Sequence, residues 1–175
     1  MKSYFRSKIP LRISFGGGGT DISPYAEMKG GLCFNATINK YAVAKIEPID
    51  KQKIILTSAN YNQSYEYKLD EKFSYSGYLK LLEGVANHYK KHTKKMGYKL
   101  YVQCDVPPGS GAGSSSAVVV SIIKVFNEWL NIYMSSYEIA NLAYDIERVK
   151  LKMKGGKQDQ FAAAYGGFNL MEFND

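Results

Sequence analysis

The stretch Pro-Pro-Gly-Ser-Gly-Ala-Gly-Ser-Ser-Ser at residues 107–116 is the most informative part of the chain. It follows an alternating strand pattern at residues 98–106 and opens an apolar helix pattern at residues 117–130. Glycines let the backbone approach an anion closely and adopt positive φ. A helix start presents unpaired N–H groups and the positive end of its dipole, and serine hydroxyls can donate to phosphate oxygens or ligate Mg²⁺. The segment therefore indicates a polyphosphate-binding turn.

Two better-known phosphate loops do not fit this segment. A Walker A loop requires lysine after its last glycine, and Ser114 occupies that place. A dinucleotide fingerprint requires the spacing GxGxxG, whereas Gly109, Gly111 and Gly113 are spaced GxGxG. An ordinary flexible loop with a serine N-cap is the alternative. The order strand, loop, buried helix favours phosphate binding.

Strand and helix patterns are mixed along the rest of the chain. Residues 10–15 alternate between apolar and polar side chains, which predicts a strand whose polar face carries Arg12. Further strands are predicted at residues 41–46, 53–57, 64–69, 98–106 and 168–173. Helices are predicted at residues 78–89, 117–130 and 135–150, the last opened by a capping box at Ser135. This mixture indicates an α+β fold, and the short connections of the first half predict antiparallel pairing.

The composition is that of one folded domain. The chain has 175 residues, of which 45% are hydrophobic and 22% are charged. Its 23 basic and 16 acidic side chains give a net charge of +7, which suits an anionic partner, either a small phosphate or a nucleic acid. Cys33 and Cys104 lie among apolar neighbours, which predicts buried thiols. With no spanning apolar run and no secretion signal, we expect a cytoplasmic protein without a membrane partner.

Three segments, in order, resemble motifs of the GHMP small-molecule kinases, the family of galacto-, homoserine, mevalonate and phosphomevalonate kinases. PLRISFGGGGTD at residues 10–21 resembles the substrate motif, PPGSGAGSSSA at 107–117 the second motif, and GGKQDQF at 155–161 the segment with the catalytic aspartate. The first motif is most similar to the sugar-kinase branch, in particular the heptose 7-phosphate kinases, with fucokinase-type enzymes next. The resemblance implies that residues 1–175 form the family's N-terminal ATP-binding domain, a mixed, mainly antiparallel sheet packed with helices and similar to ribosomal protein S5 domain 2.

The same resemblance implies roles for individual residues. Asp159 would be the general base that accepts the proton of a sugar hydroxyl, and Arg12 the basic residue that holds it ionised. Ser115 and Glu147 would hold Mg²⁺. The nucleotide would be bound by Pro107, Gly109, Ser110, Gly111, Ala112, Gly113, Ser114, Ser115 and Ser116. The sugar would be bound by Gly17, Gly18, Gly19, Thr20 and Asp21, together with Asp159.

The helix pattern adds an expectation about Glu147 that does not depend on the resemblance. Ala143 and Ala140 lie one and two turns before Glu147 on the same face. Small side chains at these places would leave room for a ligand beside the acid.

Each residue taken alone has a simpler interpretation. Asp159 could be a solvated loop acid, Glu147 a surface charge and Arg12 an edge charge. His88 and His92 have metal-ligand spacing, but the surrounding lysines favour a solvated helix end. The basic side chains of residues 148–157 could attract a substrate phosphate or form a plain solvated cluster. Only the joint match of three ordered motifs favours the functional interpretation.

The implied reaction is phosphoryl transfer from Mg·ATP to a sugar, at the anomeric hydroxyl of D-glycero-D-manno-heptose 7-phosphate in the branch that matches best. A catalytically incomplete nucleotide- or sugar-binding fragment is one alternative, and an RNA-binding domain another, although no nucleic-acid partner is expected. Members of the family usually continue into a C-terminal lobe with its own glycine-rich motif, which no residues here match. We therefore expect the first lobe of a two-lobe enzyme, which could self-associate or pair with the missing lobe.

Overall fold

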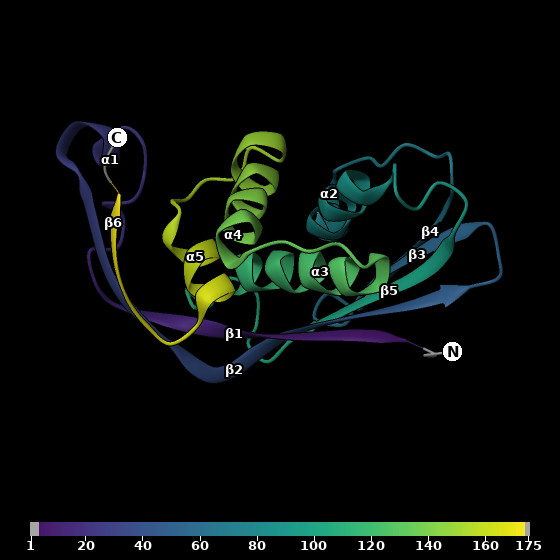
Figure 1. Ribbon diagram of the computed structural model, residues 1–175, viewed down its shortest axis with the longest axis horizontal. Helices are drawn as coiled ribbons and strands as arrows, with labels where there is room; N and C mark the ends of the chain where they lie inside the picture. Colours follow the sequence, from purple (N-terminus) through teal and green to yellow (C-terminus); the bar gives the residue numbers. More distant parts are fainter. Residues whose placement is uncertain (1–3, 174–175) are drawn as a thin grey trace.

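The computed structural model describes residues 4–173 and shows one mixed sheet covered by helices on one face (Figure 1). The strands are β1 (Phe5–Gly16), β2 (Gly31–Ile49), β3 (Lys53–Ser58), β4 (Gln63–Lys68), β5 (Gly97–Cys104) and β6 (Phe168–Phe173). Their order is β1-β2-β5-β3-β4, and β6 pairs with β2 outside this path. The α+β prediction is confirmed.

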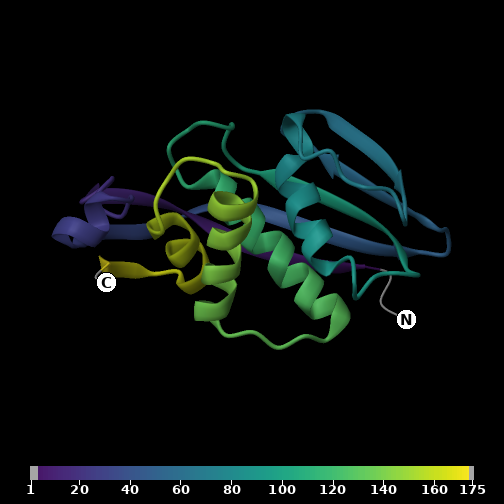
Figure 2. The same ribbon diagram turned by 90° about the horizontal axis from the view of Figure 1, so that it is seen from above.

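All but the first of the helices gather over the middle of the sheet, as the view from above shows, and the first lies at one end of it (Figure 1 and Figure 2). They are α1 (Tyr25–Lys29), α2 (Lys80–Tyr89), α3 (Ser114–Leu130), α4 (Ser136–Tyr144) and α5 (Gln158–Tyr165), with a 3₁₀ turn η1 (Gly77–Leu79) and a π-helical turn η2 (Asp145–Lys150). α3 lies on the sheet against β1 and β2, while α4 packs on α3 and α5. None of the helices within residues 4–173 is long and apolar enough to cross a membrane.

β2 is the longest strand and organises the sheet, because its two halves have different neighbours. Its first half, residues 31–36, pairs with β6, and its second half, residues 42–49, pairs with β5. β1 runs antiparallel along residues 34–46 of it. The sequence predicted only residues 41–46 of this strand. The first half was missed because it has no apolar–polar alternation: Leu32 and Phe34 are exposed, and Asn35 is buried.

One strand pair corrects the prediction of antiparallel pairing in the first half of the chain. β3 and β5 are parallel, with Leu56 opposite Leu100. The chain reaches β5 only after β4 and α2, so a helix lies in the connection between these parallel neighbours. The expectation that the connections are too short for a crossover helix was therefore wrong at this place. The other pairs in the sheet are antiparallel, as predicted.

The predicted helices also differ from the observed ones at their ends. α3 begins at Ser114, so the three serines form its first turn instead of the loop before it. The capping box at Ser135 is confirmed, since its hydroxyl accepts from the Glu138 amide and the Glu138 carboxylate accepts from the Ser135 amide. The helix that follows is not continuous to Lys150, because it changes to π geometry at Asp145.

An aromatic stack holds α2 and α3 against the sheet. The ring of Phe126 in α3 lies parallel to Tyr89 of α2 at 4.6 Å and meets Tyr98 of β5 edge-on at 5.4 Å. All three side chains are almost fully buried. Aromatic pairs with these geometries add to the hydrophobic contribution of their buried area. Cys33 and Cys104 are buried free thiols, as predicted.

We expect Phe126→Ala to lower the free energy of unfolding by about 3–5 kcal/mol, because it leaves a cavity between α2, α3 and β5. Urea denaturation followed by circular dichroism measures this loss. Tyr133→Ala is the matched control, because that ring is 92% exposed and its removal should change stability by less than about 0.5 kcal/mol. Equal effects of the two substitutions would contradict the assignment of Phe126 to the core.

Candidate active site

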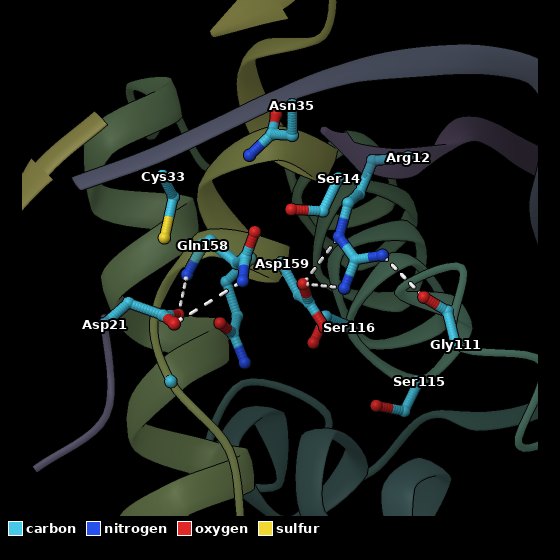
Figure 3. A network of polar contacts seen from close by, with 12 residues as sticks. Arg12, Ser14, Asp21, Cys33, Asn35, Gly111, Ser115, Ser116, Gln158 and Asp159 are labelled. Carbon is cyan, nitrogen blue, oxygen red and sulfur yellow. Dashed lines mark hydrogen bonds and ion pairs between the residues drawn. The ribbon is translucent and has the colours of Figure 1, made fainter. Parts of the chain in front are cut away.

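The side chain of Arg12 connects three parts of the fold at the predicted site. Its Nε atom donates to Asp159 Oδ1 at 2.7 Å, and its Nη2 atom contacts the same oxygen. Its Nη1 atom donates to the carbonyl oxygen of Gly111 at 2.6 Å. Figure 3 shows Arg12 reaching from β1 into the space between Asp159 and Gly111. The structure thus brings together two residues predicted to be catalytic and the glycine-rich loop.

The glycine-rich loop adopts the backbone conformation that its composition predicts. Gly109, Gly111 and Gly113 have φ of 81°, 74° and 67°, which other residues rarely adopt. At Gly113 an added Cβ would also lie 3.3 Å from Arg12 Cγ and 3.5 Å from Asp159 Cγ. Gly113, the N-cap residue of the helix that follows, has no side chain to cap it. The first turn of α3 is therefore open to receive an anion.

A cavity of about 620 Å³ opens beside this loop. Predicted site residues that line it are Arg12, Gly109, Gly111, Gly113, Ser114, Ser115 and Asp159. On another side it is lined by Tyr61 and Tyr78, whose rings stack at 4.7 Å. The sequence pattern placed Tyr78 only at the start of a predicted helix and did not connect either tyrosine with the site, because Tyr61 lies in the turn after β3 and Tyr78 in η1. The cavity combines a polar, glycine-rich wall with an aromatic one.

Glu147 is fully buried and accepts hydrogen bonds from several elements. Its Oε1 atom accepts from Ser115 Oγ at 2.9 Å, and its Oε2 atom accepts from Ser116 Oγ at 2.7 Å and Gln160 Nε2 at 2.6 Å. The Arg148 guanidinium lies 3.8 Å from Oε1. The alternative that Glu147 is a surface charge is therefore wrong. The π-helical turn places this carboxylate over the start of α3.

Two alanines predicted to leave space beside Glu147 do not do so. Ala140 and Ala143 are fully buried within the hydrophobic core, so protein fills the volume next to them. The cavity instead reaches this region from the side of Ser115. The expectation of a ligand on the alanine face is wrong because that face packs inward.

Asp159 lies in the first turn of α5 and not in a loop. Its side chain is 21% exposed, against 11% for Arg12, so the ion pair lies at the cavity surface. The neighbouring Gln160 is fully buried and belongs to the Glu147 network. Gln160 was not predicted as a site residue, because no sequence pattern distinguishes a buried glutamine from an exposed one.

The second glycine loop, residues 16–20, folds back on the start of β2. Gly17 has φ of 77°, and an added Cβ would lie 1.7 Å from the Leu32 carbonyl oxygen. The Thr20 hydroxyl donates to the Gly17 carbonyl oxygen at 2.8 Å and accepts from the Leu32 amide at 3.0 Å. Burial raises the pKa of the Cys33 thiol, which donates to the Gly17 carbonyl oxygen at 3.2 Å. The Thr20 hydroxyl, predicted to hold a sugar, is thus engaged inside its own loop.

Asp21 is buried, with 4% of its surface exposed. Its Oδ2 atom accepts from the Gln158 amide at 2.9 Å, and its Oδ1 atom accepts from Gln158 Nε2 at 3.4 Å and the Gly19 amide at 3.3 Å. In Figure 3 this cluster lies across the site from Arg12. The structure therefore places the predicted sugar ligand against the start of α5.

The two histidines and the basic stretch at residues 148–157 are the other charged groups considered in the sequence. His88 and His92 lie around the ring of Tyr89, and burial lowers the pKa of His88. Among residues 4–173 no group of three or more His, Cys, Asp or Glu side chains is arranged to hold a metal. In the basic stretch, Lys150 pairs with Asp145 at 2.6 Å. Its exposed members are Lys150, Lys152, Lys154 and Lys157.

Comparison with known proteins identifies the family. Residues 80–167, half of the chain, match the family described as GHMP kinases N terminal domain. The chain belongs to the GHMP kinases. This assignment agrees with the three motifs, two of which lie wholly or partly within the matched range.

Individual GHMP kinases align with nearly the whole chain. A D-glycero-alpha-D-manno-heptose 7-phosphate kinase of Campylobacter jejuni is 45% identical over 170 residues, which cover 96% of this chain and 50% of the relative. The crystal structure of a D-glycero-D-manno-heptose 1-phosphate kinase from Bacteroides thetaiotaomicron matches with a TM-score of 0.91 and 43% identity, over 97% of this chain and 56% of that one. Lactococcus lactis galactokinase, at 22% identity and a TM-score of 0.79, shares the fold over 97% of this chain and 47% of its own. The chain spans about half the length of the relatives it matches.

We expect Ser116→Ala to lower the free energy of unfolding by about 1–3 kcal/mol, because it removes a donor from the buried Glu147 carboxylate. Chemical denaturation measures the change. Ser114→Ala, at the open start of the same helix, is the control and should shift stability by less than about 0.5 kcal/mol. If Ser116→Ala left the free energy of unfolding unchanged, the Ser116 hydroxyl would not contribute to stabilising the buried Glu147 carboxylate.

Proposed function

We propose that the chain provides the nucleotide-binding and base-bearing part of an ATP-dependent sugar kinase. The observation that carries the proposal is the Arg12–Asp159 pair, held at the surface of a cavity whose wall is a glycine-rich loop and an uncapped helix start. A carboxylate next to a phosphate-binding turn is what phosphoryl transfer to a hydroxyl requires.

In this proposal Asp159 accepts the proton of the sugar hydroxyl while the hydroxyl oxygen forms its bond to the γ-phosphorus and the bond to ADP breaks. Arg12 orients the Asp159 carboxylate, because two of its N–H groups contact one oxygen of that carboxylate. The backbone N–H groups of the loop at residues 109–113 and of the first turn of α3 receive the phosphate charge. Positioning and charge stabilisation supply most of the acceleration in such reactions.

Mg²⁺ fits the residues present at the start of α3. Ser115 Oγ and Glu147 Oε1 are 2.9 Å apart, and hydroxyl and carboxylate oxygens are donors that Mg²⁺ accepts. Ser115 also lines the cavity in which the phosphates would lie. One carboxylate together with substrate phosphates is a common way to hold this ion. When bound, Mg²⁺ would neutralise phosphate charge.

The proposed acceptor is a sugar phosphate. Two relatives with more than 40% identity are named as kinases of heptose 7-phosphate and heptose 1-phosphate, so both of these names concern a phosphorylated heptose. We infer the anomeric hydroxyl of D-glycero-D-manno-heptose 7-phosphate as the acceptor. The exposed Lys152, Lys154 and Lys157, on the loop before α5, are candidates to bind the substrate phosphate.

We propose that the complete enzyme also needs a second part, which corresponds to the half of each relative that this chain does not cover. Family members of about twice this length bear the activity in their names. We infer that residues 1–175 act as a nucleotide-binding domain that works with a second, C-terminal lobe. A coupled ADP-release assay over a panel of sugar phosphates, run with and without the separately produced second half of the Campylobacter jejuni relative, tests this inference. Activity of equal size in both arms would overturn it.

We expect Asp159→Asn to lower turnover by about 10²- to 10⁴-fold, because the amide cannot accept the hydroxyl proton. Nucleotide affinity, measured by isothermal titration calorimetry, should stay within about threefold. Asp50→Asn, an exposed acid in the turn after β2, is the control and should leave both quantities unchanged. Turnover of the Asp159 variant at the rate of the unmodified chain would remove the general base from the proposal.

We expect Ser115→Ala to weaken nucleotide binding by about tenfold in the presence of Mg²⁺ and little in its absence. Calorimetric titrations with ATP, with and without Mg²⁺, separate the two terms. Ser76→Ala, an exposed serine before η1, should change neither affinity. A Mg²⁺ dependence equal to that of the unmodified chain would exclude Ser115 as a ligand.

A further inference from the structure

α5 begins without a cap from its own sequence. Lys157 precedes the helix, and its side chain makes no capping hydrogen bond. The carboxylate of Asp21 takes this place from a segment 137 residues earlier, by accepting the Gln158 amide hydrogen at 2.9 Å. A negative charge at a helix start is also favoured by the helix dipole. A side chain from the sugar-motif loop therefore serves as the N-terminal cap of α5.

The Asp21 carboxylate is directed at the protein. Only 4% of the residue is exposed, and its oxygens accept from the Gly19 amide, the Gln158 amide and the Gln158 side chain. Gly19 belongs to the glycine loop and Gln158 to α5, so one carboxylate joins the two. These donors stabilise the buried position of the carboxylate. If the side chain turned outward, the Gly19 and Gln158 amide hydrogens would lose their acceptor.

The approach to α5 is shaped to admit this carboxylate. At Gly156 an added Cβ would lie 2.0 Å from Asp21 Oδ2 and 2.6 Å from the Asp21 carbonyl oxygen. On the other side, Arg148 Nε donates to the Gly156 carbonyl oxygen at 3.3 Å. A Cβ added at Gly155 would lie 2.7 Å from Arg148 Nη2, so the guanidinium packs against this glycine. Asp21 and Arg148 thus hold the Gly155–Gly156 segment from both sides.

We propose that Asp21 is a positioning residue that fixes the start of α5, and through it the Asp159 carboxylate against Arg12, instead of serving only as a ligand for the sugar. Asp159 directly follows Gln158, so the amide that Asp21 holds sets the first turn that carries the base. Because Asp21 ends the glycine loop, the same contact ties the loop's conformation to the position of the base. The inference rests on the proposed function for the role of Asp159.

Amide hydrogen exchange tests the contact without requiring turnover. Asp21→Ala should accelerate exchange at Gln158 and Phe161 by about tenfold or more, since the cap is lost at the first turn. Asp21→Asn should restore protection to within about threefold, because Asn caps helices as well as Asp does. The Gln158 carboxamide can turn to present Oε1, which has no partner in the structure, to the new Nδ2 atom.

Asn127→Ala is the matched control, because it removes another buried acceptor, the partner of Tyr89 Oη at 2.6 Å, which takes no part in the Asp21 hydrogen bonds. It should lower global stability without a selective change at Gln158 and Phe161. Gly156→Ala is the second variant in case Asp21→Ala does not fold, and it should reproduce the loss of protection by displacing the carboxylate. Unchanged exchange in the Asp21→Ala and Gly156→Ala variants, or failure of Asp21→Asn to restore it, would overturn the proposal.

Steady-state kinetics then distinguishes positioning from sugar binding. If Asp21 is a positioning residue, Asp21→Ala should lower kcat by about 10- to 100-fold and leave the sugar KM within about threefold of its value in the unmodified chain. Asp21→Asn should then recover kcat. A higher sugar KM in both variants at unchanged kcat would instead make Asp21 a sugar ligand and overturn the proposal. If the unmodified chain shows no turnover, with or without the second half of a relative, the proposed function fails while the exchange data still decide the role of Asp21.

Discussion

The guanidinium of Arg12 is the constraint on which the rest of the site depends. It joins a strand to a helix 147 residues later and to a loop 99 residues later, through hydrogen bonds from Nε and Nη1. The amide of the same residue donates to the Ala112 carbonyl oxygen at 3.2 Å. Since a guanidinium offers five donors in a fixed plane, it can hold a carboxylate and a carbonyl in one defined arrangement. The absence of a side chain at Gly113 follows from this arrangement, because the Arg12 and Asp159 side chains already lie beside its Cα.

Two further carboxylates are buried around this pair, and neither depends mainly on a salt bridge. Glu147 accepts from two serine hydroxyls and a glutamine amide, and Asp21 accepts from two backbone amides and a glutamine amide. A buried carboxylate is costly unless its oxygens find donors, so each network is tied to one conformation. Both networks include a glutamine of α5, which is how a helix of eight residues is held between the glycine loop and the π-helical turn.

Comparison with the sequence-based expectations shows where pattern and packing disagree. The helix expected over residues 135–150 changes to π geometry at Asp145, and this change accompanies the burial of Glu147 over the start of α3. Ala140 and Ala143 on this helix pack into the hydrophobic core, so core side chains occupy the space that was expected to hold a ligand. β3 and β5 pair in parallel because α2 lies in the connection between them. These differences arise from tertiary contacts, which local periodicity does not report.

The sequence by itself determined the α+β class, most of the strands, the positive-φ turn at residues 107–113 and the family, because glycine spacing and apolar alternation are local properties of the chain. It also named Arg12 and Asp159, although only the fold shows that their side chains touch. What only the tertiary structure decided is which polar side chains face inward. The sequence did not predict that Asp21 and Glu147 are buried, nor that Gln160 is a partner of Glu147, because these carboxylates accept hydrogen bonds from donors in distant segments. A hydrogen bond between residues 137 positions apart leaves no periodic trace, so the joining of the glycine loop to α5 was visible only in the folded chain.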